Sequence, residues 1–322
     1  MAKIKDKTDN REMPEKMTNN TSGGVEDQKA SAKKKTASKA KNAIEKAKES
    51  AINLIDENGN GQIDIEDIII QSLKIPGIRI DRTSFLKKEF KRKYKKSVID
   101  DAIVFNPAHA GISVEAIDAI ADEVIKYERN AVSGISAALG MPGGFAMVAT
   151  IPADITQYYG YMLRAAQKLL YLYGFPEIDT AEDGEILDSG TMNALIICLG
   201  VMYGVAGANQ ALHAMAKALA KGVEKKLLDA ALTKGTIYPI VKSVSKWFGQ
   251  KMTKEVFAGF FKKAIPVVGG VIGGGITFVS FKPCCDRLKK SLRSTMLSDP
   301  NNQPEDDQDQ FADIVEAEII DE

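Results

Sequence analysis

The sequence contains few of the residues that most enzymes use for nucleophilic, metal-dependent or redox chemistry. Its 322 residues include two histidines, three cysteines and one tryptophan. His109 and His213 are far apart and neither lies near a nucleophile motif, which argues against a Ser–His–Asp triad or a zinc site. Two of the cysteines, Cys284 and Cys285, are adjacent and Cys198 is left over. Adjacent cysteines rarely form a disulfide, so we expect free thiols and a reducing compartment.

The chain also has no net charge, since 43 basic residues balance 43 acidic ones. No overall field therefore attracts it to nucleic acid. The charges are unevenly placed, because the N-terminal region is rich in lysine and the region after Asp299 is acidic without lysine or arginine. Both ends are too polar to bury much apolar area. We expect a disordered basic tail over residues 1–37 and a disordered acidic tail over residues 298–322.

Long apolar runs are missing as well. The N-terminal residues contain no apolar segment typical of a secretory signal, so the expected location is the cytoplasm, including the inner face of the cell membrane. Asn193–Ala208 and Ile265–Phe281 are somewhat shorter than the roughly 20 apolar residues of a spanning helix. Their glycines favour tight packing as buried core helices. Insertion of the region Asn193–Phe281 into a bilayer as hairpins remains a second interpretation.

The dominant positive signal is helical periodicity, and alternating strand patterns are absent. Apolar residues recur every three or four positions, for example along the helix expected after the N-cap Ser113. Its predicted buried face consists of Ile117, Ile120, Val124, Ile125 and Tyr127. The fold class is therefore all-α: a helix-loop-helix unit over residues 38–76, then a multi-helix globular body with glycine-rich packing segments over residues 80–297.

The most specific pattern is the twelve-residue segment Asp56–Asp67, DENGNGQIDIED. Oxygen-bearing groups stand at the alternating positions that an EF-hand calcium loop requires, with Gly61 at the sharp turn and Ile63 as the apolar plug. Helical patterns precede and follow it. The predicted ligands are Asp56, Asn58, Asn60, Gln62 (through its main-chain carbonyl), Asp64 and Asp67.

The loop departs from the usual pattern at its last position, where Asp67 replaces glutamate. The shorter side chain makes bidentate coordination harder, so we expect modest affinity for Ca²⁺ and admit six-coordinate Mg²⁺. We find no second loop of this type. A single hand has no sister within the chain, so pairing between two copies is open. The alternative is a polar turn that only caps the following helix.

Two further groups of residues are candidates for function. Asp154 and Arg164 lie among apolar residues. They could form a catalytic pair. We favour a structural pair between them, or a helix that has Pro152 near its start and the Asp154 charge in its first turn. The lysine- and aromatic-rich region after Tyr238 could contact an anionic membrane or a protein partner, although a core helix with a solvated lysine face is favoured. Its candidate contact residues are Lys242, Lys246, Trp247, Phe248, Lys262 and Lys263.

The region from Tyr127 to Arg293 resembles the EcsC family of bacterial proteins. The residues that carry the resemblance are Ala137-Ala-Leu-Gly-Met-Pro-Gly-Gly144 with Ile151-Pro-Ala-Asp154, the helix ending in Tyr171-Leu-Tyr-Gly174, and Ile265-Pro-Val-Val-Gly-Gly-Val-Ile-Gly-Gly-Gly-Ile276. The resemblance implies an α-helical cytoplasmic protein associated with the membrane. It brings no reaction or active site, and the family pattern has no EF-hand loop. The family often has asparagine where Thr277 stands here.

These observations together predict a calcium-binding, EcsC-like helical protein that is regulatory or membrane-associated rather than an enzyme. Its predicted partners are calcium and either an anionic membrane surface or a protein. The alternatives are an enzyme of unknown reaction that uses Asp154 and Arg164 in a helical pocket, and a protein that inserts hairpins into a bilayer.

Overall fold

The computed structural model describes residues 63–140, 146–178, 187–222, 225–251 and 269–302, and the single residues Asn42, Glu49, Asp56 and Gly59. The chain divides into two units, Met1–Glu45 and Lys46–Glu322, and every helix named below belongs to the second. These described residues contain helices and no strand, which confirms the all-α prediction. The helices are α2 (Ile65–Leu73), α3 (Arg82–Phe90), α4 (Lys96–Val104), α5 (Val114–Gly140), α6 (Ala146–Leu172), α7 (Ser189–Tyr203), α8 (Ala208–Ala220), α9 (Lys225–Thr233), α10 (Tyr238–Lys251) and α12 (Gly269–Arg293).

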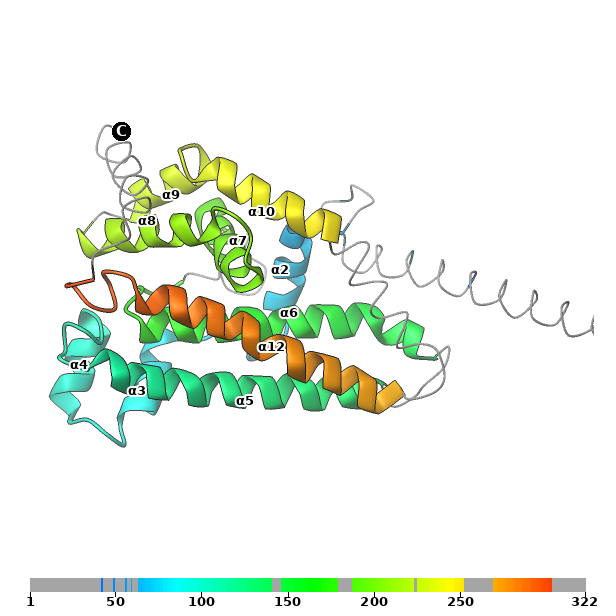
Figure 1. Ribbon diagram of the computed structural model, residues 1–322, viewed down its shortest axis with the longest axis horizontal. Coiled ribbons are helices and arrows are strands. Elements are labelled where there is room, and N and C mark those ends of the chain that lie inside the picture. Colours follow the sequence, from blue (N-terminus) through cyan, green and yellow to red (C-terminus); the bar gives the residue numbers. More distant parts are fainter. Residues whose placement is uncertain are drawn as a thin grey trace, which may run out of the picture. The chain divides into compact units, whose positions relative to one another are not determined.

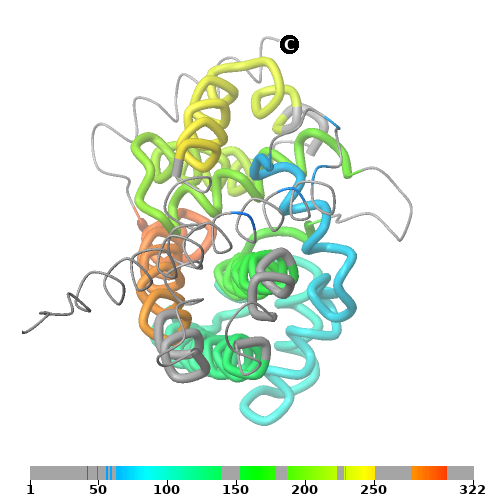
Figure 2. Tube along the Cα trace, turned by 90° about the vertical axis from the view of Figure 1, so that its right-hand side faces the viewer, coloured from blue at the N-terminus to red at the C-terminus, as the bar shows by residue number. Residues whose placement is uncertain are grey.

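The three long helices α5, α6 and α12 pack lengthwise against one another (Figure 1). Figure 2 shows α5 and α6 nearly end-on, with α12 beside them. Side-chain contacts fix an antiparallel register between α5 and α12. At one end Arg293 Nε donates to Asp118 Oδ2 over 2.6 Å, and at the other Thr277 Oγ1 donates to Ser136 Oγ over 3.3 Å.

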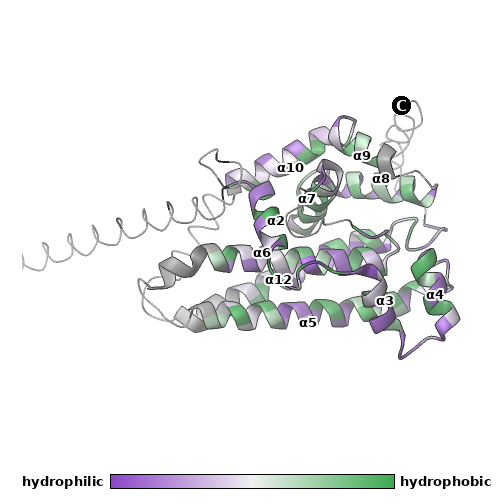
Figure 3. Cartoon of the chain, turned by 180° about the vertical axis from the view of Figure 1, so that it is seen from behind, coloured by the Kyte–Doolittle hydropathy of each residue, from purple (hydrophilic) through white to green (hydrophobic). Residues whose placement is uncertain are grey.

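The buried face of α5 differs from the predicted one at a single turn. Ile117, Ile120, Val124 and Ile125 are buried as expected, but the Tyr127 side chain is 63% exposed. The next residue, Glu128, is fully buried in its place. The prediction relied on apolar spacing and was wrong at this turn, because the buried face of α5 continues from Val124 to the charged Glu128, four positions later. Figure 3 shows the alternation of apolar and polar residues along α5.

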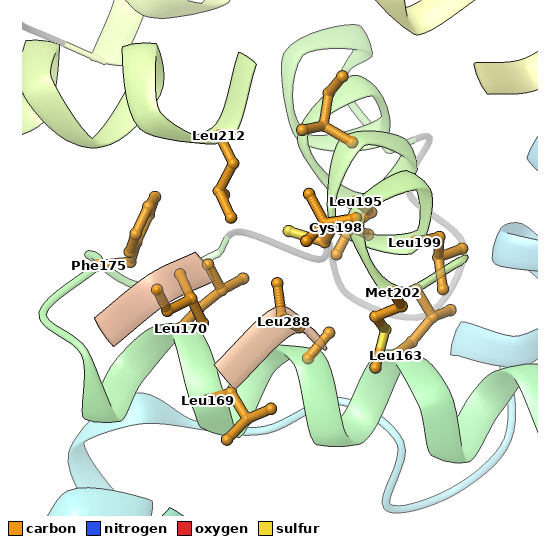
Figure 4. Close-up of a cluster of buried hydrophobic side chains, with 14 of the residues drawn as sticks. Leu163, Leu169, Leu170, Phe175, Leu195, Cys198, Leu199, Met202, Leu212 and Leu288 are labelled. Atoms are coloured by element: carbon orange, nitrogen blue, oxygen red, sulfur yellow. The ribbon is translucent and has the colours of Figure 1, made fainter. Parts of the chain in front are cut away.

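Helix α7 is enclosed by other helices. It contacts α2, α6, α8, α9, α10 and α12, and all but three of its residues are buried. Figure 4 shows its labelled residues packing toward α6, α8 and α12; they are Leu195, Cys198, Leu199 and Met202. A helix that is apolar on every face needs such a complete cover. The stretch Asn193–Ala208 is therefore a core helix and the turn that follows it.

Two glycines separate α7 from α8. Helix α7 ends at Tyr203 with Gly204 as its C-cap, and α8 begins after Gly207. Their φ angles are +71° and +84°. Glycine adopts these left-handed values without a steric penalty, so the chain reverses here.

Helices α3 and α5 both begin at a capping side chain. The N-cap of α3 is Asp81, whose carboxylate accepts the Ser84 N–H over 2.6 Å. The predicted cap of α5 is confirmed, because Ser113 Oγ accepts the Ala116 N–H over 3.3 Å.

Candidate functional site

The structure describes the last five residues of the candidate calcium loop, residues 63–67, without a gap. Asp56 and Gly59 are described as single residues, and Gly59 has a φ angle of +69°. The predicted ligands Asn58, Asn60 and Gln62 lie outside the described residues. Ile63, the predicted apolar plug, is 6% exposed and belongs to the hydrophobic core. The loop therefore joins the hydrophobic core immediately before its last two predicted ligands, Asp64 and Asp67.

Asp64 and Asp67 form a reciprocal capping box at the start of α2. Asp64 Oδ1 accepts the Asp67 N–H, and Asp67 Oδ2 accepts the Asp64 N–H, each over 3.2 Å. Asp67 is 1% exposed and Asp64 is half-buried. The two carboxylates satisfy main-chain donors that every helix start leaves unpaired. Their negative charge is also favourable at the positive end of the helix dipole.

The same two residues are positions 9 and 12 of the candidate cation loop. Helix α2 begins at Ile65, so that loop positions 9 and 12 fall one turn apart at its first turn. Carboxylate oxygens are the ligands that Ca²⁺ and Mg²⁺ prefer. The donor chemistry of Asp64 and Asp67 thus fits a hard cation. Within the described part of the chain, no group of three histidine, cysteine or acidic side chains could hold a metal ion.

Helix α2 is anchored to the body by polar contacts as well as by its apolar face. Ser245 Oγ of α10 donates to Glu66 Oε1 over 2.7 Å, and Ser72 Oγ donates to the Thr156 carbonyl of α6 over 2.9 Å. Ile65 and Ile69 are completely buried in the same core as the long helices. The end of the loop is consequently continuous with the packing of α6 and α10.

The structure places Asp154 and Arg164 in separate contacts. Ser136 Oγ donates to Asp154 Oδ1 over 2.9 Å, and the same hydroxyl accepts from Thr277. Arg164 instead donates to Glu128 and to the Gly77 carbonyl. The two residues are ten positions apart on one helix, about 15 Å along its axis. The expected Asp154–Arg164 pair is therefore wrong.

The expectation that Asp154 occupies the first turn of its helix is also wrong. Helix α6 begins at Ala146, so Pro152 and Asp154 stand after its first turn. Asp154 is 9% exposed, Ser136 3% and Thr277 4%. Their hydrogen bonds connect α6, α5 and α12, and bury a polar group between these three helices near one end of α5.

A buried ionic cluster is the main polar feature that the sequence did not predict. Glu128 Oε1 accepts from Lys168 Nζ and, over 3.2 Å, from Arg164 Nε. The side chains of Glu128 and Lys168 are 0% and 8% exposed, whereas Arg164 is 22% exposed. Burial lowers the pKa of Lys168 even though the Glu128 carboxylate opposes that change. Glu128 Oε2 is buried without a hydrogen-bond partner.

The residues proposed for membrane or partner contact divide between surface and core. Lys242 and Lys246 of α10 are exposed, and Trp247 is half-buried. Phe248 is fully buried, with its ring 5.2 Å from that of Tyr203. The described part of this region is therefore an amphipathic helix whose lysines face outward. Lys262 and Lys263 lie outside the described residues.

The cysteines and His213 have structural environments. All three cysteines are free and buried, and burial raises the pKa of Cys198 to about 12 and that of Cys284 to about 11. Thiols with such values stay protonated near neutral pH and are poor nucleophiles. His213 is 5% exposed and its Nε2 lies 3.3 Å from Ser294 Oγ, as expected for a satisfied histidine on a helix.

No described helix combines the length and apolar character needed to cross a membrane. The sequence matches no protein-family model, no curated protein and no solved structure.

Proposed function

We propose that this chain is a calcium-binding, non-enzymatic protein with an EcsC-type helical body, located in the cytoplasm and at the inner face of the cell membrane. The observation that carries the proposal is the position of Asp64 and Asp67. These two acidic positions of the Asp56–Asp67 loop are held together at the start of a helix that is packed into the body. The bound ion is Ca²⁺, with Mg²⁺ as the alternative.

The contacts of α2 suggest how an ion in the loop would act on the rest of the protein. A cation at Asp64 and Asp67 neutralises charge beside the first turn of α2. Glu66 lies between these residues and accepts the Ser245 hydroxyl of α10. Helix α10 also carries the exposed Lys242 and Lys246. Ion binding therefore biases the surface that these lysines present to anionic lipid or to an acidic partner.

The affinity should be modest. Asp67 provides a shorter side chain than the usual glutamate, and only three of the ligand positions are carboxylates, Asp56, Asp64 and Asp67. Ligand charge and rigidity set the affinity of such loops. We expect a dissociation constant for Ca²⁺ of about 10⁻⁵ to 10⁻³ M, the weaker part of the EF-hand range.

Calcium titration by calorimetry tests the proposal. The wild-type protein should release or absorb heat with one site per chain, and Asp56→Ala and Asp67→Asn should weaken or abolish binding. Asp67→Asn keeps an oxygen that can accept the Asp64 N–H, so the helix start is preserved. Equal heats from wild type and Asp56→Ala would refute the proposed site.

Asp81→Asn is the matched control. Asp81 caps α3 as Asp64 caps α2, but it lies outside the loop. This variant should bind Ca²⁺ like the wild type.

Sedimentation with phosphatidylserine vesicles, with and without Ca²⁺, then tests the surface of α10. Calcium-dependent recovery with the vesicles should fall in the double variant Lys242→Gln, Lys246→Gln, while its calorimetric heat stays unchanged.

A further inference from the structure

A cavity of about 130 Å³ lies between the end of α6 and the helices α7, α8 and α9. Its wall includes Leu170 of α6, Cys198 of α7, Met215 of α8 and Leu232 of α9. Figure 4 labels two of these residues, Leu170 and Cys198, which extend from α6 and α7. The lining is predominantly apolar. A wall of this kind offers few of the polar partners that an ordered water molecule needs.

The cavity exists because α7 presents small residues at this face. Gly190, Ala194 and Cys198 follow one another at intervals of four residues, so they lie on one stripe of the helix and line the cavity. On its other faces α7 carries large side chains such as Leu195 and Leu199, which are completely buried. The space left by the small residues is therefore a property of the sequence of α7.

The rim of the cavity carries a carboxylate. Pro176 and Glu177 line the cavity and are exposed, so that the cavity opens to solvent at this side. The Arg82 main-chain N–H donates to Glu177 Oε1 over 3.1 Å and holds it there. The Arg82 guanidinium donates to main-chain carbonyls, including that of Phe175, rather than to this carboxylate. Arg82 also attracts Glu177 electrostatically, but Arg82 is 6% exposed whereas Glu177 is exposed at the rim. A ligand carboxylate at the rim would therefore meet Glu177 first, and its negative charge disfavours a second carboxylate there.

We propose that this cavity binds the hydrocarbon part of a ligand that carries no negative charge. An engineered apolar cavity of about 150 Å³ accommodates benzene, so a cavity of about 130 Å³ takes about six carbon atoms. The ligand is a small hydrocarbon-like molecule, or the end of a longer uncharged chain whose remainder leaves past Pro176. The proposal is independent of the cation loop.

Methyl NMR of the protein labelled with ¹³C at its methionine methyl groups locates the ligand directly. Met215 lines the cavity, and Met162 is buried in the core without lining it. Addition of 1-hexanol should shift the Met215 signal, assigned with Met215→Leu, and leave that of Met162 unchanged. A Met215 signal that does not move at saturating 1-hexanol would overturn the proposal.

A pair of alanine variants controls for changes in folding. Ala194→Leu places a larger side chain in the cavity and should abolish the 1-hexanol shift. Ala116→Leu on α5 is the matched control, because it too is a half-buried helical alanine but does not line the cavity. It should bind 1-hexanol like the wild type. Retained binding in Ala194→Leu would show that the ligand lies elsewhere and would overturn the proposal.

Chain length distinguishes the two kinds of ligand. In a series of primary alcohols the affinity should rise about fourfold for each added methylene until the cavity is filled. A plateau beyond that length identifies the end of a longer chain, and a decline identifies a small enclosed molecule. An affinity that is independent of chain length from the start would contradict binding in the cavity.

The charge requirement has its own test. The wild type should bind 1-hexanol and hexylamine at least tenfold more tightly than hexanoate at neutral pH. Glu177→Gln keeps the oxygen that accepts the Arg82 N–H and removes the charge, so it should reduce this discrimination against hexanoate. Equal binding of hexanol and hexanoate by the wild type would refute the role of Glu177.

Discussion

Replacement of Glu128 by glutamine should destabilise the fold strongly, because it removes the charge that compensates two cations. Glu128 is completely buried and accepts from Lys168 and Arg164, whose side chains are 8% and 22% exposed. Glutamine keeps the shape of the side chain and the Oε1 acceptor. The variant therefore isolates the loss of charge from the loss of packing.

The expected loss is about 3 kcal/mol of the free energy of unfolding. Removal of one partner from a buried ion pair typically costs about 3–5 kcal/mol, because the remaining charge is left uncompensated. Glutamine can still accept from Lys168, and solvent reaches part of Arg164, so the lower end applies. The double variant Glu128→Leu, Lys168→Met removes both buried charges. It should recover most of the loss, since apolar replacement of a whole buried pair is often neutral or stabilising.

The pH dependence of the stability is a second, independent test of whether the Glu128 charge stabilises Lys168. Burial lowers the pKa of Lys168 in the folded protein below the ordinary value of 10.5. At a pH between the lowered pKa and 10.5, Lys168 binds a proton more often in the unfolded chain than in the folded protein. The free energy of unfolding therefore rises with pH in this interval. Glu128→Gln removes the carboxylate that opposes the lowering and widens this interval. The deficit of the variant should therefore be smaller at a pH of about 10 than at neutral pH, although the Arg164 contribution remains.

Urea unfolding followed by far-ultraviolet circular dichroism measures both effects. The midpoint should shift while the slope with urea stays constant, as expected for a change in stability alone. A loss below about 1 kcal/mol that does not vary with pH would mean that water solvates Lys168 and Arg164. The buried cluster would then not contribute as the structure indicates.

Three further substitutions test local features of the body by the same unfolding measurement. Ser136→Ala should cost about 1–3 kcal/mol, because the buried Asp154 carboxylate loses a donor; a change within 0.5 kcal/mol would contradict this. Gly174→Ala should cost more than Gly111→Ala, since both have positive φ but only the first would place its Cβ 2.8 Å from a main-chain oxygen; equal losses would count against it. Asp81→Ala should cost about 1 kcal/mol. Hydrogen bonds from Ser84 hold the Asp81 pKa below 3.8, so this contribution should be present above that pH and fade as the pH falls further.

The sequence was sufficient to predict the fold class and most of the buried face of α5. Ile117, Ile120, Val124 and Ile125 repeat at helical spacing, and each is buried. Spacing assigns a residue to a face but does not identify its partner on another helix. For this reason Tyr127 was placed inside, whereas Glu128 occupies the inner position and meets Lys168 from α6. The partner of a buried charge depends on the tertiary register, which a single sequence does not reveal.

For the candidate cation loop, the sequence is more informative than the described part of the structure. Ligand spacing in Asp56–Asp67 predicts a cation loop from sequence alone, and the described part adds where this segment joins the body. The capping box of Asp64 and Asp67 was expected only as the alternative to metal binding. The two interpretations use the same carboxylates in compatible ways, because helix starts and cations both attract negative oxygen atoms. The cavity beside α7 could not be predicted, since it depends on which elements face the small residues of that helix.

The buried polar groups explain how three long helices with many small residues keep a single register. Apolar contacts change little when one helix slides by a turn, a displacement of about 5.4 Å. Such a shift of α6 along α5 would separate Glu128 from Lys168, and at the same time Ser136 from Asp154. Both losses leave buried polar atoms unsatisfied, which raises the free energy of every alternative register. The Glu128–Lys168 and Ser136–Asp154 contacts thus lie at two positions along the interface between α5 and α6. Each of them opposes a sliding of the helices that the apolar contacts alone would tolerate.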